Sequence, residues 1–451
     1  MSASLGYGIA FGARHVAALA TVALLTRTVS AELFGQYVLL RIGLSFANVL
    51  TDLGASTAQI RLVADAAAGL RRQWVGTYLA WRACAAFMLA LMTGAAVAVW
   101  APQQLRGELV VPGVAAYATW ILSDATGHSL RAFERHRRNI AGILAGMLAQ
   151  LPALIWLVVL EDGGLSGVLW SFAIADAVTL SVAVSGLSDC VGAPRVASAW
   201  NLLRFGAPTS FPRVVRAVAA LDRHLISATL GVAHAALYQV GAQTSAAVAW
   251  IEFSVLNSAE PRSYAVGDDG AWLSRLTAGF AVVVLCVSSS LTLLSRELVT
   301  IVASSRYGNA FVLVGPLLIA AVQHAVCSLV NLRASRAYAP RVWAYSGGLD
   351  LVLSFTLMAA LLPLYGAEGA AWARCVGASA ALCLSLALTR RQLPAALPVW
   401  RLGLGVPLLL LAAHAISLFT PGIGPRALVA ALCLSALFAF TRAQRRRSKN
   451  I

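Results

Sequence analysis

The sequence predicts an all-α polytopic membrane protein with about 14 transmembrane helices, and three observations support this fold class. Of the 451 residues, 59% are hydrophobic and only 12% are charged, whereas soluble proteins have about 25% charged residues. Apolar runs of about 18 residues or more, long enough to cross a bilayer, recur along the whole chain. These runs are continuous and lack the period-two alternation that is typical of a membrane β-barrel.

Fourteen candidate spans follow one another, with short loops between them. They cover residues 5–28, 35–58, 76–100, 109–128, 140–160, 165–187, 205–230, 234–258, 273–295, 310–331, 342–363, 368–389, 402–420 and 425–441. The first span is expected to be retained, because it has no basic start and no small-residue cleavage site. No loop is long enough to hold an extramembrane catalytic domain.

The distribution of basic residues predicts the orientation in the membrane. Of the 34 Lys and Arg residues, 22 lie in one set of alternate loops and in the C-terminal tail, 5 lie on the opposite side and 7 lie within spans. Because basic loops stay in the cytoplasm, both termini are predicted to be cytoplasmic. The net charge of +16 is therefore spread over short loops, which argues against nucleic-acid binding, and the tail is expected to contact anionic membrane lipids.

Seven arginines lie inside the candidate spans, where a charge costs at least about 2.5–3.5 kcal/mol on insertion scales. They are Arg14, Arg41, Arg82, Arg213, Arg216, Arg223 and Arg374. Three of them share the seventh span and fall within an arc of about 80° on an ideal helix, which predicts a basic stripe. A buried basic stripe is suited to an anionic ligand, so the sequence indicates a transporter of a phosphate-bearing or otherwise acidic molecule.

Each arginine also has a structural interpretation. Arg14 lies near the membrane midplane and is expected to face a cavity, while Arg41 could instead reach an interface. Arg82 is expected to snorkel as an anchor near the cytoplasmic end of its span, and Arg374 is expected to be structural. Neighbours in a helix point about 100° apart, so an alternative is that Asp222 pairs with another helix while Arg223 snorkels outward.

Intramembrane acids are candidates for carrying a coupling H⁺ or Na⁺. Asp176 is the preferred candidate because it lies near the middle of the sixth span, and Asp52 and Asp222 are the other two. The alternative is that each acid forms a structural ion pair. The seven cysteines have no metal-ligand spacing, and no metal or cofactor is expected.

A weak internal repeat of about 200 residues relates the first and seventh spans. Phe11-Gly-Ala-Arg14 leads to Phe34-Gly-Gln-Tyr37, and Phe211-Pro-Arg213 leads to Ala235-Ala-Leu-Tyr238. Two six-span halves in parallel register would place a binding cleft near the bilayer midplane. Chance similarity between Ala-rich helices is the alternative.

An ordered set of short motifs resembles the oligosaccharide-lipid flippases of the multidrug/oligosaccharidyl-lipid/polysaccharide (MOP) exporter superfamily. The motifs are Leu25-Thr-Arg27, Phe34-Gly-Gln-Tyr37, Asp52-Leu-Gly54, Arg61, Leu203-Arg-Phe-Gly-Ala-Pro208, Asp222-Arg223, Gly231, Leu237-Tyr238, Arg306-Tyr-Gly-Asn-Ala310 and Tyr365-Gly-Ala-Glu-Gly-Ala-Ala371. Each motif alone is weak, but together they cover nearly the whole chain in the family's order.

The resemblance implies a V-shaped bundle of two six-helix lobes, residues 1–195 and 196–395, followed by spans 13 and 14 with a basic tail, residues 396–451. It also implies alternating access and a substrate made of an oligosaccharide on undecaprenyl pyrophosphate, for envelope polysaccharides such as lipopolysaccharide or exopolysaccharide. The family's cavity is cationic, and its counterparts here are Arg14, Arg41, Arg213, Arg216 and Arg223. A polymerase or glycosyltransferase of the same pathway is an expected partner.

Two other functions remain as alternatives. A drug/cation antiporter of the same superfamily would be expected to have twelve spans and an acid-lined cavity. A membrane polymerase or glycosyltransferase would be expected to have a large external loop or a shared acidic metal dyad, and this chain has neither. The sequence therefore favours a non-enzymatic flippase.

Overall fold

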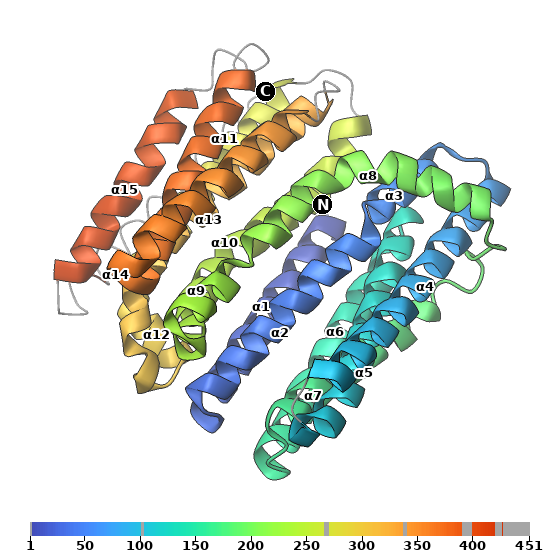
Figure 1. The fold of residues 1–451 in the computed structure, drawn as a ribbon. Coiled ribbons are helices and arrows are strands. Elements are labelled where there is room, and N and C mark those ends of the chain that lie inside the picture. The colour runs from blue at the N-terminus through green and yellow to red at the C-terminus, as the bar shows by residue number, and fades with distance from the viewer. Residues whose placement is uncertain are drawn as a thin grey trace. The chain divides into compact units, whose positions relative to one another are not determined.

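The computed structural model of the chain describes residues 2–100, 103–265, 270–336, 341–389, 399–419 and 426 (Figure 1). These residues are almost wholly helical, and none of them is in a strand, as the predicted all-α fold requires. Contacts within the chain define two compact units, Met1–Leu221 (unit 1) and Asp222–Ile451 (unit 2). Their boundary falls within the predicted seventh span, and the division at residues 195 and 395 stays a prediction.

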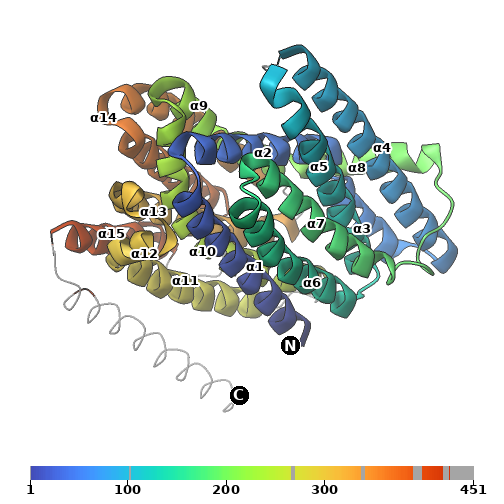
Figure 2. The ribbon, with the colours of Figure 1, turned by 90° about the horizontal axis from the view of Figure 1, so that it is seen from below.

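Unit 1 consists of eight α-helices and one short π-helix. They are α1 (Ser2–Thr28), α2 (Ala31–Asp52), α3 (Ala55–Asp65), α4 (Ala68–Trp100), α5 (Gln103–Ala132), α6 (His136–Leu154), the π-helix (Ile155–Leu160), α7 (Gly164–Val184) and α8 (Val196–Ala219). Ser30 caps α2 by accepting a hydrogen bond from the Leu33 amide (3.2 Å), which satisfies one of the free donors at a helix start. Within this unit α6 and α7 pack closely, and so do α5 and α7 (Figure 2).

The predicted span 35–58 is not one continuous helix. Leu53 and Gly54 both take left-handed backbone conformations, with φ of 46° and 75°, and separate α2 from α3. Glycine adopts this conformation freely, whereas leucine is rarely found there. Asp52 is the last residue of α2, so its carboxylate lies directly before the break.

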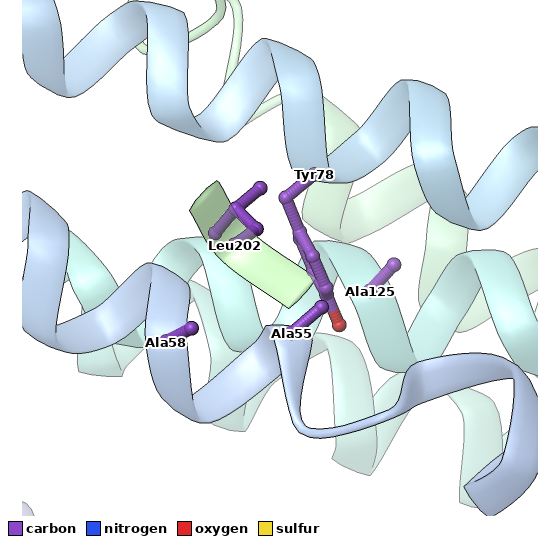
Figure 3. Packing of buried hydrophobic residues seen from close by; sticks show 5 residues of the cluster. All are labelled: Ala55, Ala58, Tyr78, Ala125 and Leu202. Atoms are coloured by element: carbon purple, nitrogen blue, oxygen red, sulfur yellow. The ribbon is translucent and has the colours of Figure 1, made fainter. Parts of the chain in front are cut away.

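Helix α8 packs against this break within unit 1. A Cβ atom added at Gly206 would lie 2.6 Å from the carbonyl carbon and 2.7 Å from the carbonyl oxygen of Gly54, so only glycine permits this approach. Leu202, one turn earlier, is buried in a cluster with Ala55, Ala125 and the ring of Tyr78 from α4, as Figure 3 shows. The small alanines leave space for the Tyr78 ring, whose hydroxyl group points towards the break.

Unit 2 consists of seven described α-helices and one short 3₁₀ helix. They are α9 (Asp222–Leu230), α10 (Val232–Ala265), α11 (Gly270–Leu293), α12 (Ser295–Val302), the 3₁₀ helix (Ser305–Ala310), α13 (Phe311–Arg336), α14 (Arg341–Thr389) and α15 (Val399–Phe419). Helix α14 covers two predicted spans and bends at Gly366 (φ 59°), three residues after Pro363. The predicted fourteenth span lies outside the described residues, apart from the buried Arg426, which pairs with Glu297 (2.8 Å).

Eight helices in the described part of the chain are long and apolar enough to cross a membrane, or nine if α11 and α12, which are bent by 76°, together form one span. The protein is therefore a multi-pass membrane protein. The predicted span 205–230 is divided between α8 and α9, with turn residues at Ala220 and Leu221. No proline or glycine marks this turn, so no local pattern predicts it.

Replacing Gly206 with alanine is expected to destabilise unit 1 by about 1–3 kcal/mol, because the new methyl group meets backbone atoms that cannot rotate away. The measurement is the thermal unfolding midpoint of the purified protein in detergent. Gly43→Ala in α2 is the control, since nothing lies within 4 Å of its added Cβ, and it should leave the midpoint unchanged or raise it. Equal midpoints for Gly206→Ala and wild type would contradict the close packing of α8.

Candidate functional site

A series of charged side chains runs through unit 1 from α8 to α5, and we name it the arginine–carboxylate chain. Its members, in spatial order, are Arg213, Asp52, Arg82, Asp124, His128 and Arg131. Positive and negative groups alternate along most of this series, so each carboxylate has cations as neighbours. Burial of charge in a membrane protein requires such compensation.

Asp52 is the most highly coordinated member of the chain. Its Oδ2 atom accepts a hydrogen bond from Ser56 (2.7 Å) and lies 3.3 Å from Nη1 of Arg213. Its Oδ1 atom accepts a hydrogen bond from the Tyr78 hydroxyl (3.3 Å) and lies 3.8 Å from Nη1 of Arg82. The helix break after Asp52 brings Ser56 to the carboxylate, and the sequence prediction missed both Ser56 and Tyr78.

Arg82 is completely buried, so the prediction that it snorkels to an interface is wrong. Its guanidinium lies 3.8 Å from Asp52 and 3.7 Å from Asp124, and it donates a hydrogen bond to the Asn48 side chain. Helix α4 begins at Ala68, eight residues before the predicted span. Arg82 therefore lies about 21 Å along the helix by helix rise, too far from the end to reach an interface.

Arg213 joins α8 to the start of α3 and remains 43% exposed. Its Nη1 atom donates to Ser56 (2.6 Å), and its Nη2 atom donates to the Thr57 hydroxyl (2.9 Å). The predicted single stripe of Arg213, Arg216 and Arg223 is wrong, because the turn at Ala220 and Leu221 places the third arginine on α9 in unit 2. Arg216 lies on α8, but its side chain lies outside what the structure describes.

Arg14 on α1 and Arg41 on α2 are both exposed, and both act electrostatically on the half-buried carboxylate of Asp176 on α7. Asp176 accepts one hydrogen bond, from Ser123 of α5 (3.2 Å). Among the described residues Arg14 forms no hydrogen bond or ion pair. This is the least compensated intramembrane arginine that the structure describes.

Aromatic side chains hold Arg41 in place. Its guanidinium lies over the Phe172 ring, 5.0 Å from the centroid, and donates a hydrogen bond to the Tyr37 hydroxyl (2.7 Å). Tyr37 in turn stacks on Phe172, with centroids 6.0 Å apart. Cation–π contact and one neutral acceptor orient the guanidinium without neutralising its charge, so Arg41 keeps its capacity to bind an anion.

Unit 2 contains a second buried carboxylate with a similar set of donors, which we name the Asp222 cluster. Asp222 accepts hydrogen bonds from Arg223 (2.7 Å) and from the Tyr238 hydroxyl (3.1 Å), and Nε of Arg374 lies 3.8 Å away. Asp222 pairs with other helices, as in the structural alternative considered from the sequence, but Arg223 does not point away from it as that alternative required. The arginine is long enough to fold back from the first turn of α9, and it also lies over the Tyr238 ring (5.2 Å).

Outside the predicted spans, Arg135 binds the segment that follows α7. Its guanidinium forms two hydrogen bonds to Asp189 (2.7 and 2.5 Å) and one to the Gly186 carbonyl (2.6 Å). The Arg135 guanidinium lowers the pKa of Asp189 to about 2, so the pair stays charged at every physiological pH. In the described part of the chain, no group of three or more His, Cys, Asp or Glu residues is arranged to hold a metal.

The sequence matches no family model and no curated protein, but the fold matches solved transporters. The lipid II flippase MurJ in an inward closed conformation has a TM-score of 0.73 at 12% identity, over 99% of both chains. The MATE transporter VcmN of Vibrio cholerae, in a mutant form, has a TM-score of 0.64 at 14% identity, over 86% of this chain and 96% of that one. A MATE transporter in the straight conformation has a TM-score of 0.66 at 11% identity, over 88% and 95%.

These likenesses confirm that the chain has the fold of MOP-superfamily transporters, as the sequence motifs predicted. At 11–14% identity they concern the fold alone. MurJ and the MATE transporters carry different substrates by their names, so the substrate of this chain must be argued from its own residues.

Arg82→Met is expected to destabilise the protein by about 3–5 kcal/mol, because it leaves two carboxylates near each other without the guanidinium that compensates them. The thermal unfolding midpoint measures this effect. Adding Asp124→Asn to Arg82→Met should recover part of the loss, because one of the uncompensated charges is then removed. An unchanged midpoint for Arg82→Met would mean that Arg82 reaches water, as first predicted from the sequence.

Proposed function

We propose that this protein is a flippase that moves an undecaprenyl-pyrophosphate-linked oligosaccharide across the bacterial inner membrane by alternating access, for envelope polysaccharide assembly. The observation that supports this most is the exposure of Arg14 and Arg41 in helices of unit 1 that are long and apolar enough to span a membrane, together with the exposure of Arg213 on α8. Exposed cations within spans are costly unless they face water and serve a ligand.

The contrast with the buried arginines supports a ligand role for the exposed ones. Arg82 has two carboxylates within 3.8 Å, so its charge is already compensated and its function is structural. Arg14 has no such partner among the described residues, and Arg41 contacts only aromatic and hydroxyl groups. The positive charges of these two guanidinium groups are therefore the least compensated, and they can attract an anion most strongly.

A pyrophosphate suits this arrangement. It carries at least two negative charges and several acceptor oxygens, and arginine binds phosphate oxygens through pairs of parallel hydrogen bonds. Arg14, Arg41 and Arg213 are proposed as its ligands. Arg216 and Arg223 remain weaker candidates, because the side chain of Arg216 is not described and Arg223 is engaged with Asp222.

The positive-inside distribution supports cytoplasmic termini and an inner-membrane location. From that side, a negatively charged headgroup would be attracted to the arginines and then exposed outside after reorientation of the helices. Polymerase or glycosyltransferase enzymes of the same pathway are the proposed partners, since they would consume the translocated substrate or produce it.

Asp176 is proposed as the coupling residue for H⁺ or Na⁺, ahead of Asp52 and Asp222. Asp52 and Asp222 each lie within 3.8 Å of two arginines and a tyrosine hydroxyl. Asp176 accepts a single hydrogen bond and has no arginine within ion-pair distance among the described residues. A carboxylate with fewer fixed donors binds and releases a small cation more readily.

A drug/cation antiporter is the second candidate, and the likeness to MATE transporters supports it. The exposed arginines of unit 1 oppose it, because they would repel a cationic drug. Increased sensitivity to cationic drugs in a deletion strain, with an unchanged lipid-linked pool, would favour the antiporter over the flippase.

In a strain lacking the protein, we expect lipid-linked oligosaccharide to accumulate on the inner leaflet and surface glycan to disappear. Arg14→Ala and Arg41→Ala should each reduce complementation at least about tenfold, since each removes a charge-assisted contact worth about 1.5–3 kcal/mol. Surface glycan and the leaflet distribution of the lipid-linked pool are measured together. Arg27→Ala, outside the span core, is the charge-matched control, and full complementation by all variants would refute the proposed ligand role.

Asp176→Asn is expected to slow transport while leaving substrate binding within about twofold of wild type. The amide keeps a hydrogen bond from Ser123 but cannot take up a cation. The measurement is transport into proteoliposomes with and without an imposed proton or sodium gradient. If the variant still responds to the gradient as wild type does, Asp176 is not the coupling residue.

A further inference from the structure

The contacts of Asp52 and Arg213 are unequal, and this inequality has a functional consequence. Asp52 is 9% exposed and retains Ser56, Tyr78 and Arg82 as donors even without Arg213. Arg213 is 43% exposed, and Asp52 is the only carboxylate within ion-pair distance of it among the described residues. Asp52 and Arg213 can therefore separate while Asp52 keeps its other hydrogen-bond and ion-pair partners.

Of the two arginines on Asp52, only Arg213 is free to exchange partners. Arg82 is completely buried between two carboxylates and has no route to a ligand. Arg213 faces outward and forms its other contacts with the neutral hydroxyl groups of Ser56 and Thr57. A hydroxyl group holds a guanidinium more weakly than a charged acceptor does.

We propose that Asp52 is an internal competitor for Arg213, which lowers the affinity for an anionic headgroup according to how strongly that headgroup engages this arginine, and so favours release of the ligand. The proposal rests on the flippase function proposed above. A ligand gains Arg213 only if its attraction exceeds that of the carboxylate already in place. A pyrophosphate carries more charge and more acceptor oxygens than a monophosphate, so it meets this condition more easily.

The packing of α8 supports the competition. Gly206 fixes the backbone of α8 against Gly54 at the α2/α3 break, so Arg213 remains near Asp52 whether or not a ligand is bound. The exchange then needs only a rotation of the arginine side chain, with no loss of the helix packing. Capture and release of a ligand by Arg213 are thus possible at a rigid site.

The test is the affinity of the purified full-length protein in nanodiscs for two probes, undecaprenyl pyrophosphate and undecaprenyl monophosphate. We expect Asp52→Asn to bind the pyrophosphate about two- to fivefold more tightly, the range given by a half-exposed ion pair, and the monophosphate by a smaller factor, because the monophosphate engages Arg213 less. The ratio of the two affinities, pyrophosphate over monophosphate, should rise. Asp52→Glu, which keeps the charge, should retain the ratio of wild type.

Asp124→Asn is the matched control. It removes the other carboxylate on Arg82 but leaves the pair of Asp52 and Arg213 intact, so the ratio should remain that of wild type. If Asp52→Asn alone does not fold, judged by thermal unfolding, the double variant Asp52→Asn/Arg82→Gln removes the buried charges together and carries the same expectation.

The outcomes separate this inference from the proposed function. An equal change of the ratio in the Asp52 and Asp124 variants, or a fall or no change in the Asp52 variant, overturns the competitor role alone. Failure of the wild-type protein to bind undecaprenyl pyrophosphate, or binding that Arg213→Gln does not weaken, overturns the flippase proposal and the inference with it. A higher ratio in the Asp52 variant, together with the wild-type ratio in the Asp124 variant, supports both.

Discussion

The buried guanidinium of Arg82 is the interaction on which the described structure of unit 1 most depends. At 3.7–3.8 Å from two carboxylates, each pair is worth about 4 kcal/mol at an effective dielectric constant of 20, before the cost of removing the groups from water. Because Asp52 belongs to α2, Asp124 to α5 and Arg82 to α4, this one side chain fixes three helices. It thereby fixes the helix break after Asp52, and with it the position of Ser56 and Thr57.

Burial divides the intramembrane arginines into two classes that their chemistry alone does not separate. Arg82 and Arg374 lie beside buried acids, and each acid already has a tyrosine hydroxyl group. Arg14 and Arg41 have no carboxylate within ion-pair distance among the described residues, although both act on Asp176 from further away. The first class compensates buried acids, and the second class is the one proposed above to bind a ligand. Arg213 belongs to both classes, because it is paired and still exposed.

Much of the helical pattern could be predicted, because a continuous apolar run that crosses a bilayer forms a helix. The positions of the helix breaks could not be predicted. Leu53 adopts a left-handed conformation that its residue type disfavours, and the turn at Ala220 and Leu221 has neither glycine nor proline. Tertiary contacts, such as the approach of Gly206 to Gly54, set these positions, and no local pattern records them. The burial of Arg82 could not be predicted either, because its distance from the end of the helix depends on where α4 begins.

The two buried aspartates show how similar local chemistry leads to different roles. Asp52 and Asp222 both lie next to a helix break, and each has two arginines and one tyrosine hydroxyl within 3.8 Å. The difference lies in exposure, because Arg213 is 43% exposed whereas Arg223 and Arg374 are 16% and 17% exposed. An anion can reach the first network without dismantling it, but in the second network it would have to displace buried ion pairs. This difference in exposure supports the proposal that an anionic ligand binds in unit 1, whereas the Asp222 cluster of unit 2 is closed by its own ion pairs.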